Sequence, residues 1–305
     1  MTIRSLRLSL CLMAGLSLFT LFVSDACQAA SAASSDAKET TSALDAAVNE
    51  DAGSKVASTV DGQERVTVSP DQAFVLIAGE AEKGNVDAML NLGSFYERGF
   101  GIARNFGKAK EWYQKAADTG SGVGLYNVGV CYEIGMGTEV NVAKALSFYE
   151  KADAASFSPA PLKMYTLYLN GSGVPKDETK AVSYLQKAAN AGNSEALSIL
   201  GVAQLYGQNG IQKNGAEAVK SITKSAEAGN MEAVKNLGVI FKDGIEVKPS
   251  PETALQWFFI LKKAGYQGDD IDPIIQDLQQ KVGVNKAGDS EKAADAWIEK
   301  RRAAK

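Results

Sequence analysis

Histidine, the residue that most often carries acid–base and metal chemistry, does not occur among the 305 residues of the chain. A Ser-His-Asp triad, a Cys-His pair and zinc binding by histidine are therefore excluded. Paired carboxylates, a lysine nucleophile and a Ser-Lys dyad remain open. The 32 basic and 36 acidic residues give a net charge of −4, which argues against non-specific nucleic-acid binding because that requires a basic surface. No catalytic residue, metal ion or cofactor is predicted.

Polar side chains recur at one position of a regular spacing. Asn91, Asn127 and Asn236 occupy this position, with Lys163 and Ile199 in the two copies between them. Each amide offers both a donor and an acceptor, so a row of amides suits the backbone of an extended peptide. The alternative is that these asparagines are merely solvated, or that they brace neighbouring helices through hydrogen bonds.

Other polar residues extend this candidate binding site. Tyr126, directly before Asn127, is predicted to offer a stacking surface with a polar tip. Glu97 and Arg98 are predicted to form the rim of the site, together with Glu133, Lys242 and Asp243.

An internal repeat determines the elements that position these residues. A residue pair recurs at intervals of 36, 36, 36 and 37 residues, and a glycine follows each pair six positions later. Five copies in register indicate a solenoid, in which each repeat packs on its neighbours. The five pairs are Leu92-Gly93, Val128-Gly129, Met164-Tyr165, Leu200-Gly201 and Leu237-Gly238.

Each copy is predicted to hold two helices, so the fold class is all-α. Ala88, Leu92 and Tyr96 recur at i, i+4 and i+8 and mark the buried face of the first helix. Gly93 costs about 1 kcal/mol relative to alanine inside a helix, so we expect another helix to approach closely there. The aromatic residues of the second helices are predicted to be core, with ligand stacking as the alternative. The second helices are predicted to begin at a recurring N-cap: Asn105, Asn141, Asp177, Asn214 and Ser250.

The two ends of the array differ from its centre. Ser69-Pro70 lies one repeat before Asn105 and predicts a lone second helix, from Pro70 to about Lys83. After the solenoid of residues 67–266, the segment 267–305 is predicted to form capping helices, over 271–282 and about 290–302. Trp297 is expected to pack back onto the last repeat.

The N-terminal residues 1–30 have the order of a secretory signal peptide: a basic start, the apolar stretch 8–23 and a run of small residues. We expect cleavage after Ala29 or Ala32 and a periplasmic or secreted protein, the alternative being an uncleaved inner-membrane anchor. This uncharged, mostly apolar stretch of sixteen residues is shorter than the 20 or so residues that a membrane span requires. No membrane span is therefore predicted in the mature chain.

The segment 31–66 is rich in Ala, Ser, Asp, Thr and Glu, and is predicted to be a disordered linker because it has little apolar surface to bury. Two of the three cysteines precede it. Lipidation of Cys27 is a minor alternative, because the residues before it lack the usual leucine. Once the signal is removed, only Cys131 remains and no internal disulfide is expected.

The repeat resembles the Sel1-like repeat, a relative of the tetratricopeptide repeat, over about residues 69–265. The resemblance implies an α/α superhelix whose first helices line a concave face and whose usual role is protein–protein interaction. Asn91, Asn127, Lys163 and Asn236 would then face the concavity. The resemblance rests on the pattern Gly84-x-x-x-Ala88-x-x-x-Leu92-Gly93-x-x-Tyr96-x-x-Gly99-x-Gly101, then Lys108-Ala109-x-x-Trp112-Tyr113-x-Lys115-Ala116-Ala117-x-x-Gly120.

The favoured function is that of a non-enzymatic adaptor of the bacterial cell envelope, which binds a protein or peptide. The protein is predicted to have no nucleic-acid partner and to be a monomer. One alternative is an envelope hydrolase of the β-lactamase type, carried by analogy with cysteine-rich members of the family. Those members have paired cysteines in every repeat, whereas Cys131 is the only cysteine in this array. The other alternative is a secreted effector directed at a host.

Overall fold

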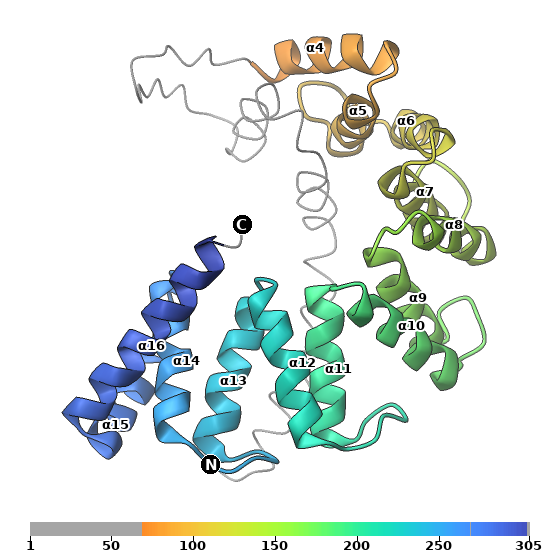
Figure 1. Cartoon of the computed structure of the whole chain (residues 1–305). Helices are drawn as coiled ribbons and strands as arrows, with labels where there is room; N and C mark the ends of the chain where they lie inside the picture. The colour runs from red at the N-terminus through yellow and green to blue at the C-terminus, as the bar shows by residue number, and fades with distance from the viewer. Residues whose placement is uncertain (1–68, 269, 304–305) are drawn as a thin grey trace. The chain divides into compact units, whose positions relative to one another are not determined.

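The computed structural model describes residues 69–268 and 270–303, and over these residues it contains thirteen α-helices and no strand (Figure 1). The prediction of an all-α fold is confirmed. The chain divides into two compact units between Ala155 and Ser156, and each is described by itself. The predictions of a signal peptide over 1–30 and a linker over 31–66, with Cys11 and Cys27, lie outside the described residues.

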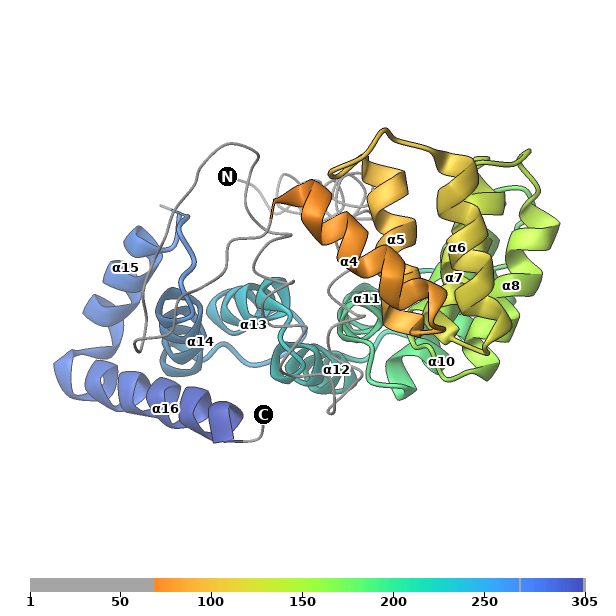
Figure 2. The same cartoon turned by 90° about the horizontal axis from the view of Figure 1, so that it is seen from above.

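The first unit holds a lone helix followed by two helix pairs, and the second holds three pairs followed by two closing helices (Figures 1 and 2). The first unit consists of α4 (Pro70–Glu82), α5 (Val86–Arg98), α6 (Phe106–Asp118), α7 (Gly122–Ile134) and α8 (Val142–Ala154). The second consists of α9 (Pro159–Asn170), α10 (Glu178–Asn190), α11 (Ser194–Tyr206), α12 (Gly215–Glu227), α13 (Met231–Asp243), α14 (Pro251–Lys263), α15 (Asp272–Val282) and α16 (Val284–Ala303).

The five predicted N-caps of the second helices are confirmed. In each, a side-chain oxygen accepts a hydrogen bond of 2.9–3.2 Å from the backbone N–H three residues later, which satisfies a group that the helix itself leaves unpaired. The lone helix α4 also begins as predicted, because Ser69 and Gln72 form a reciprocal capping box.

The first helices have caps of their own, which the sequence analysis did not identify. Asn85, Ser121, Asn193 and Asn230 accept from the backbone N–H three residues on, at 2.9–3.2 Å. In α9 the corresponding Ser158 makes no such bond, and the helix has 12 residues where the other first helices have 13. Proline begins this helix, which is compatible with a first turn because the N–H groups there have no partner within the helix.

The glycine inside each first helix is required by the second helix of the same repeat. A Cβ built on Gly93 would lie 2.5 Å from Cε1 of Tyr113, and a Cβ built on Gly129 would lie equally close to Cε1 of Tyr149. Real Cβ atoms do not approach so closely, so the expected close approach of two helices is confirmed. The third copy reverses the sizes, because Tyr165 stands at the glycine position.

A second contact joins the first and second helices within the second, third and fourth repeats. Tyr132 stacks on Phe148 and Tyr168 stacks on Tyr184, both with ring centroids 5.7 Å apart. In the fourth repeat the same two positions are polar, and Ser221 donates a 2.9 Å hydrogen bond to Gln204. The residues at both positions therefore change together, and in the fourth repeat a hydrogen bond replaces the stacking of two rings.

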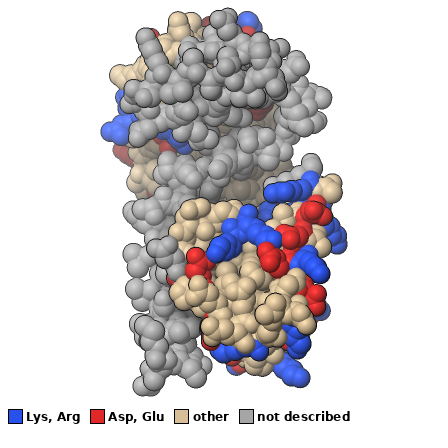
Figure 3. Space-filling model, turned by 90° about the vertical axis from the view of Figure 1, so that its left-hand side faces the viewer, with Lys and Arg blue, Asp and Glu red and all other residues tan. Residues whose placement is uncertain are grey.

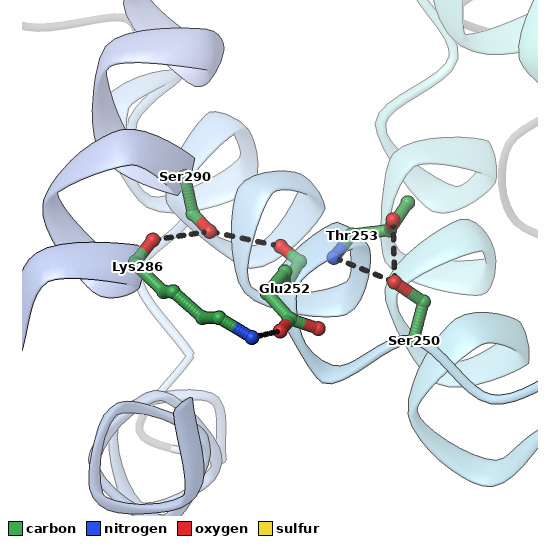
Figure 4. Close-up of polar contacts among 5 residues, drawn as sticks. All are labelled: Ser250, Glu252, Thr253, Lys286 and Ser290. Carbon is green, nitrogen blue, oxygen red and sulfur yellow. Dashed lines mark hydrogen bonds and ion pairs between the residues drawn. The ribbon is translucent and has the colours of Figure 1, made fainter. Parts of the chain in front are cut away.

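The C-terminal helices close the second unit by packing on α14. Trp297 of α16 meets Trp257 of α14 edge to face at 5.6 Å, which confirms the predicted return of Trp297 to the last repeat. The start of α16 is attached as well, because Lys286 pairs with the Glu252 carboxylate at 2.7 Å and Ser290 donates to the Glu252 carbonyl (Figure 4). Acidic and basic side chains lie next to one another on this side of the second unit, beside a larger area of other residues (Figure 3).

The predicted start of the last helix was wrong. α16 begins at Val284, six residues before the predicted Ser290. Lys286 lies within this extra stretch and Ser290 directly follows it. Both contact α14, so packing against another helix favours the helical conformation there.

Candidate binding surface

The five residues at the predicted binding position lie on five first helices. Asn91 on α5 and Asn127 on α7 belong to the first unit; Lys163, Ile199 and Asn236 on α9, α11 and α13 belong to the second. All five are half-buried. In each helix the residue lies two positions before the glycine position, and the next residue, such as Leu92, is buried against the neighbouring helix. The five side chains therefore occupy equivalent places, held by the same packing in each repeat.

The three asparagines of this row retain their full hydrogen-bonding capacity. Within the part of the chain that the structure describes, the side chains of Asn91, Asn127 and Asn236 form no hydrogen bond, and none of their polar atoms is buried without a partner. Their amides thus reach solvent instead of bracing a neighbouring helix. Lys163 differs, because it already interacts with another group of the chain.

The prediction for Tyr126 is corrected by the structure. Tyr126 is only 8% exposed, and its ring packs against that of Tyr149 with centroids 5.3 Å apart. The residues at the same place in two other first helices, Leu90 and Leu162, are also buried. This position belongs to the core, and Tyr126 offers no stacking surface to a ligand.

An exposed aliphatic residue that the sequence analysis did not identify lies on the same helix. Ile134 at the end of α7 is 61% exposed. Asn127, the half-buried Val130 and Ile134 follow one another at i, i+3 and i+7, so they share one face of the helix. This face of α7 combines an unpaired amide with apolar surface.

Two of the predicted rim residues join the two helices of their own repeat. Glu97 accepts a 2.6 Å hydrogen bond from the hydroxyl of Tyr113, and Glu133 accepts one of 2.5 Å from Tyr149. Burial raises the pKa of both tyrosines well above 10, and the adjacent carboxylate raises it further. The hydroxyls therefore remain protonated donors, and both glutamates are half-buried braces.

The sequence contains a signal for this pairing that could have been used. The first two repeats combine the glutamate with a tyrosine 16 residues later, whereas the last repeat has Lys242 and Phe258 at these places. A phenylalanine has no hydroxyl to donate, and the acceptor is lost with it. Lys242 instead pairs with its neighbour Asp243 at 2.5 Å. The other predicted rim residue, Arg98, is exposed and interacts with another group of the chain.

Cys131 is held in the core of the first unit and is poorly suited to chemistry. Its side chain is fully buried, and burial raises the pKa of the thiol to about 12, with a further contribution from Glu97. Because the thiolate is the reactive form, this cysteine is a packing residue at neutral pH.

Two further properties of the described residues concern ligands and membranes. Between residues 69 and 303, with Asp269 left aside, Cys, Asp and Glu side chains do not gather in groups of three or more that could hold a metal ion. Over the same residues, none of the helices combines the length and apolarity needed to cross a bilayer.

Comparison with solved structures finds similar proteins. A Sel1 repeat protein from Oxalobacter formigenes is 26% identical with a TM-score of 0.56, and the match covers 77% of this chain and 94% of that one. A protective antigen of uropathogenic Escherichia coli with an SLR fold is 20% identical with a TM-score of 0.48, over 78% of this chain and 66% of that one. No curated protein sequence matches the chain.

The Sel1 repeat family model matches five segments, at residues 86–121, 122–152, 166–193, 194–230 and 232–269. These segments follow the helix pairs described above and together span more than half of the chain. Proteins of this family generally mediate protein–protein interactions and are generally not catalytic. The 36-residue period, the paired helices and the model match agree: the chain belongs to the Sel1 repeat family.

Proposed function

We propose that this protein is a non-enzymatic adaptor that binds a protein or peptide along the exposed face of its first helices. The observation that carries the proposal is the repeated position that Asn91 and Asn127 occupy in the first unit and Asn236 occupies in the second. These three amides occupy one structural position, reach solvent and form no hydrogen bond with the described part of the chain. Amides left unpaired at a repeated position are suited to successive peptide groups of a partner.

The proposed binding mode combines hydrogen bonds with an apolar contact. Asn91 and Asn127 would each donate to a carbonyl and accept from an N–H of an extended segment in the first unit. Ile134, on the same face of α7 as Asn127, would cover an apolar side chain of that segment. Lys163 and Asn236 would contribute corresponding contacts in the second unit. Arg98 and the paired Lys242 and Asp243 would lie at the edge of the surface.

The proposed compartment is the bacterial cell envelope, as a periplasmic or secreted protein. It is supported by the signal-peptide pattern of residues 1–30. The array stabilises itself by packing and does not require a disulfide, since Cys131 is buried as a free thiol. Fractionation of a tagged full-length protein tests the compartment, and recovery from the cytoplasm would contradict it.

The test of the binding site compares two sets of substitutions in the full chain. The first set is Asn91→Ala, Asn127→Ala and Asn236→Ala, and the control set is Asn190→Ala and Asn285→Ala. Both control asparagines are exposed and lie outside the first helices, at the end of α10 and near the start of α16. The readout is the amount of each co-purifying protein, measured by quantitative mass spectrometry.

We expect the first set to lose one or more partners that the wild type and the control set retain, with unchanged helix content by circular dichroism. Equal recovery in all three samples would contradict the amide site. The non-enzymatic part of the proposal is tested separately with purified protein and a chromogenic β-lactam, where acylation or turnover would contradict it.

A further inference from the structure

Three lysines of the first unit gather around a pair of stacked aromatic rings. The helix α7 packs against both α6 and α8 (Figure 1), and Tyr132 of α7 stacks on Phe148 of α8. The ammonium nitrogen of Lys110, on α6, lies 4.3 Å from the centre of the Tyr132 ring, and that of Lys144, on α8, lies 5.3 Å from it. Lys151 lies over the Phe148 ring at 5.1 Å. We call these five residues the lysine–aromatic surface.

The charge of these lysines is not neutralised by a neighbouring carboxylate. Among the residues that the structure describes, Lys110, Lys144 and Lys151 form no ion pair and no hydrogen bond, and their contacts are those with the two rings. In the second unit, by contrast, Lys213 pairs with Glu246 at 2.8 Å. Two ammonium groups that approach the same ring repel each other, and a carboxylate placed between them would replace this repulsion by attraction.

Lys110 stands at a position that is apolar in every other copy of the repeat. Its side chain is half-buried, so a lysine there loses part of its hydration, whereas an apolar residue would gain by packing. A lysine at this position together with one at the position of Lys144 on the next second helix occurs once in the array. Between α10 and α12 the same two places hold Val182 and Glu217. The residues at the place of Lys110 in the other copies are Phe74, Leu146, Val182, Val219 and Leu255.

The lysine–aromatic surface lies on a different side of the first unit from the row of asparagines. Tyr132 follows Asn127 by five residues on α7, which turns it about 140° around the helix axis. An exposed apolar side chain adjoins the surface on α6. Phe106, 40% exposed, precedes Lys110 by one helical turn and shares its face of the helix. The surface therefore offers unpaired positive charge next to an exposed ring.

We propose that the lysine–aromatic surface binds an acidic segment of a partner protein. One carboxylate would lie between Lys110 and Lys144, and a second would pair with Lys151 through charge-assisted hydrogen bonds. Lys144 and Lys151 are seven residues apart on α8, or about 10 Å along its axis. An extended chain covers this distance in about three residues. Acidic residues at positions i and i+3 therefore fit the surface, and an apolar residue beside them would cover Phe106.

A nucleic acid fits the same surface less well. The Tyr132 ring, on which a base would have to stack, is already stacked on Phe148. A long polyanion would also meet the net charge of −4 of the chain, whereas a short acidic segment contacts the local surface alone.

The test measures binding of a short fluorescein-labelled peptide, with glutamate at every third position, to the full chain by fluorescence anisotropy. The same peptide with glutamine in place of glutamate, and an oligothymidylate of similar length, are measured in parallel. The test variant carries Lys110→Leu and Lys144→Gln, where leucine is the residue type of the next copy. The control variant carries Lys108→Gln and Lys115→Gln. It loses the same charge from exposed lysines that also lie over aromatic rings, but on another side of α6 from Lys110.

We expect the wild type and the control variant to bind the glutamate peptide equally well, and the test variant to bind it at least about tenfold more weakly, the loss that one charge-assisted hydrogen bond produces. Circular dichroism and urea unfolding show that both variants are folded. Equal affinity of the wild type for the glutamate and glutamine peptides would overturn the proposal. So would an equal loss in the two variants, which would identify a general charge effect, or tighter binding of the oligothymidylate than of the glutamate peptide.

Discussion

The close contact between Gly129 and Tyr149 leads to a quantitative prediction for Gly129→Ala. A Cβ at this position would lie 2.5 Å from Cε1 and 2.7 Å from Cδ1 of Tyr149. The ring cannot move away freely, because it is fully buried and its hydroxyl is bonded to Glu133. Overpacking of this kind costs about 1–3 kcal/mol, against a gain of about 1 kcal/mol in helix propensity. We expect a net loss of up to about 2 kcal/mol in the free energy of unfolding.

The matched control is Gly79→Ala in α4. Gly79 also lies inside a helix, but nothing lies within 4 Å of the Cβ that would be added. This substitution should raise the free energy of unfolding by about 1 kcal/mol, since only the propensity term acts. Both values are measured by urea denaturation followed by circular dichroism, in the same buffer and at the same protein concentration.

A double-mutant cycle then assigns the loss to the ring. The Tyr149→Leu background places leucine on the second helix, as Leu185 does in the third repeat. In this background Gly129→Ala should become neutral or stabilising. The coupling between the two sites is expected to be at least about 1 kcal/mol. If Gly129→Ala stabilises the wild type as Gly79→Ala does, or if the two changes at Gly129 and Tyr149 are additive, the steric explanation is refuted.

Three further predictions follow from single contacts. Ser156 has a φ of 62°, in the left-handed region, where the other copies have glycine. Ser156→Gly should therefore raise the free energy of unfolding by about 0.5 kcal/mol, whereas Ala155→Gly beside it, at φ −82°, should lower it. A loss of stability in both variants would contradict the backbone argument. Cys131 should stay unmodified by iodoacetamide at pH 8 in the native protein and react fully in urea, because the native fold buries its thiol. Peptide mass spectrometry measures the modification, and rapid labelling of the native protein would contradict the burial. The hydrogen bond from Lys235 lowers the pKa of the Asp270 carboxyl from its ordinary value of 3.8, so this ion pair stabilises the fold at neutral pH and ceases to do so as the pH falls below about 4. The free energy of unfolding, measured from pH 5 to 2, should therefore fall less steeply in Asp270→Asn than in the wild type. Identical slopes would contradict this prediction.

Much of the fold could be predicted because its determinants are local and repeated. An asparagine such as Asn105 caps its helix through a bond to a residue three positions away, so spacing alone identifies it. The start of α16 could not be found in this way. Its first residues include Gly288, which disfavours a helix, and they are helical because Lys286 and Ser290 contact α14.

The candidate site was less predictable, because helix periodicity gives a direction but not the neighbours. Tyr126 lies one residue before Asn127, yet it is buried, since the second helix of its own repeat brings Tyr149 against it. Comparison with Leu90 and Leu162 at the equivalent places would have identified it as core. The roles of the buried tyrosines and their glutamates depend on tertiary contacts that no single segment contains.

The most direct test of the proposed binding face is site-specific photo-crosslinking in cells that express the full chain. A photoreactive amino acid is placed at Asn91, Asn127 or Asn236, and at Asn190 on the second helix α10 as the control. We expect crosslinks to another protein from the three first-helix positions and none from the control. Crosslinks from Asn190 alone, or equally from all four positions, would contradict it.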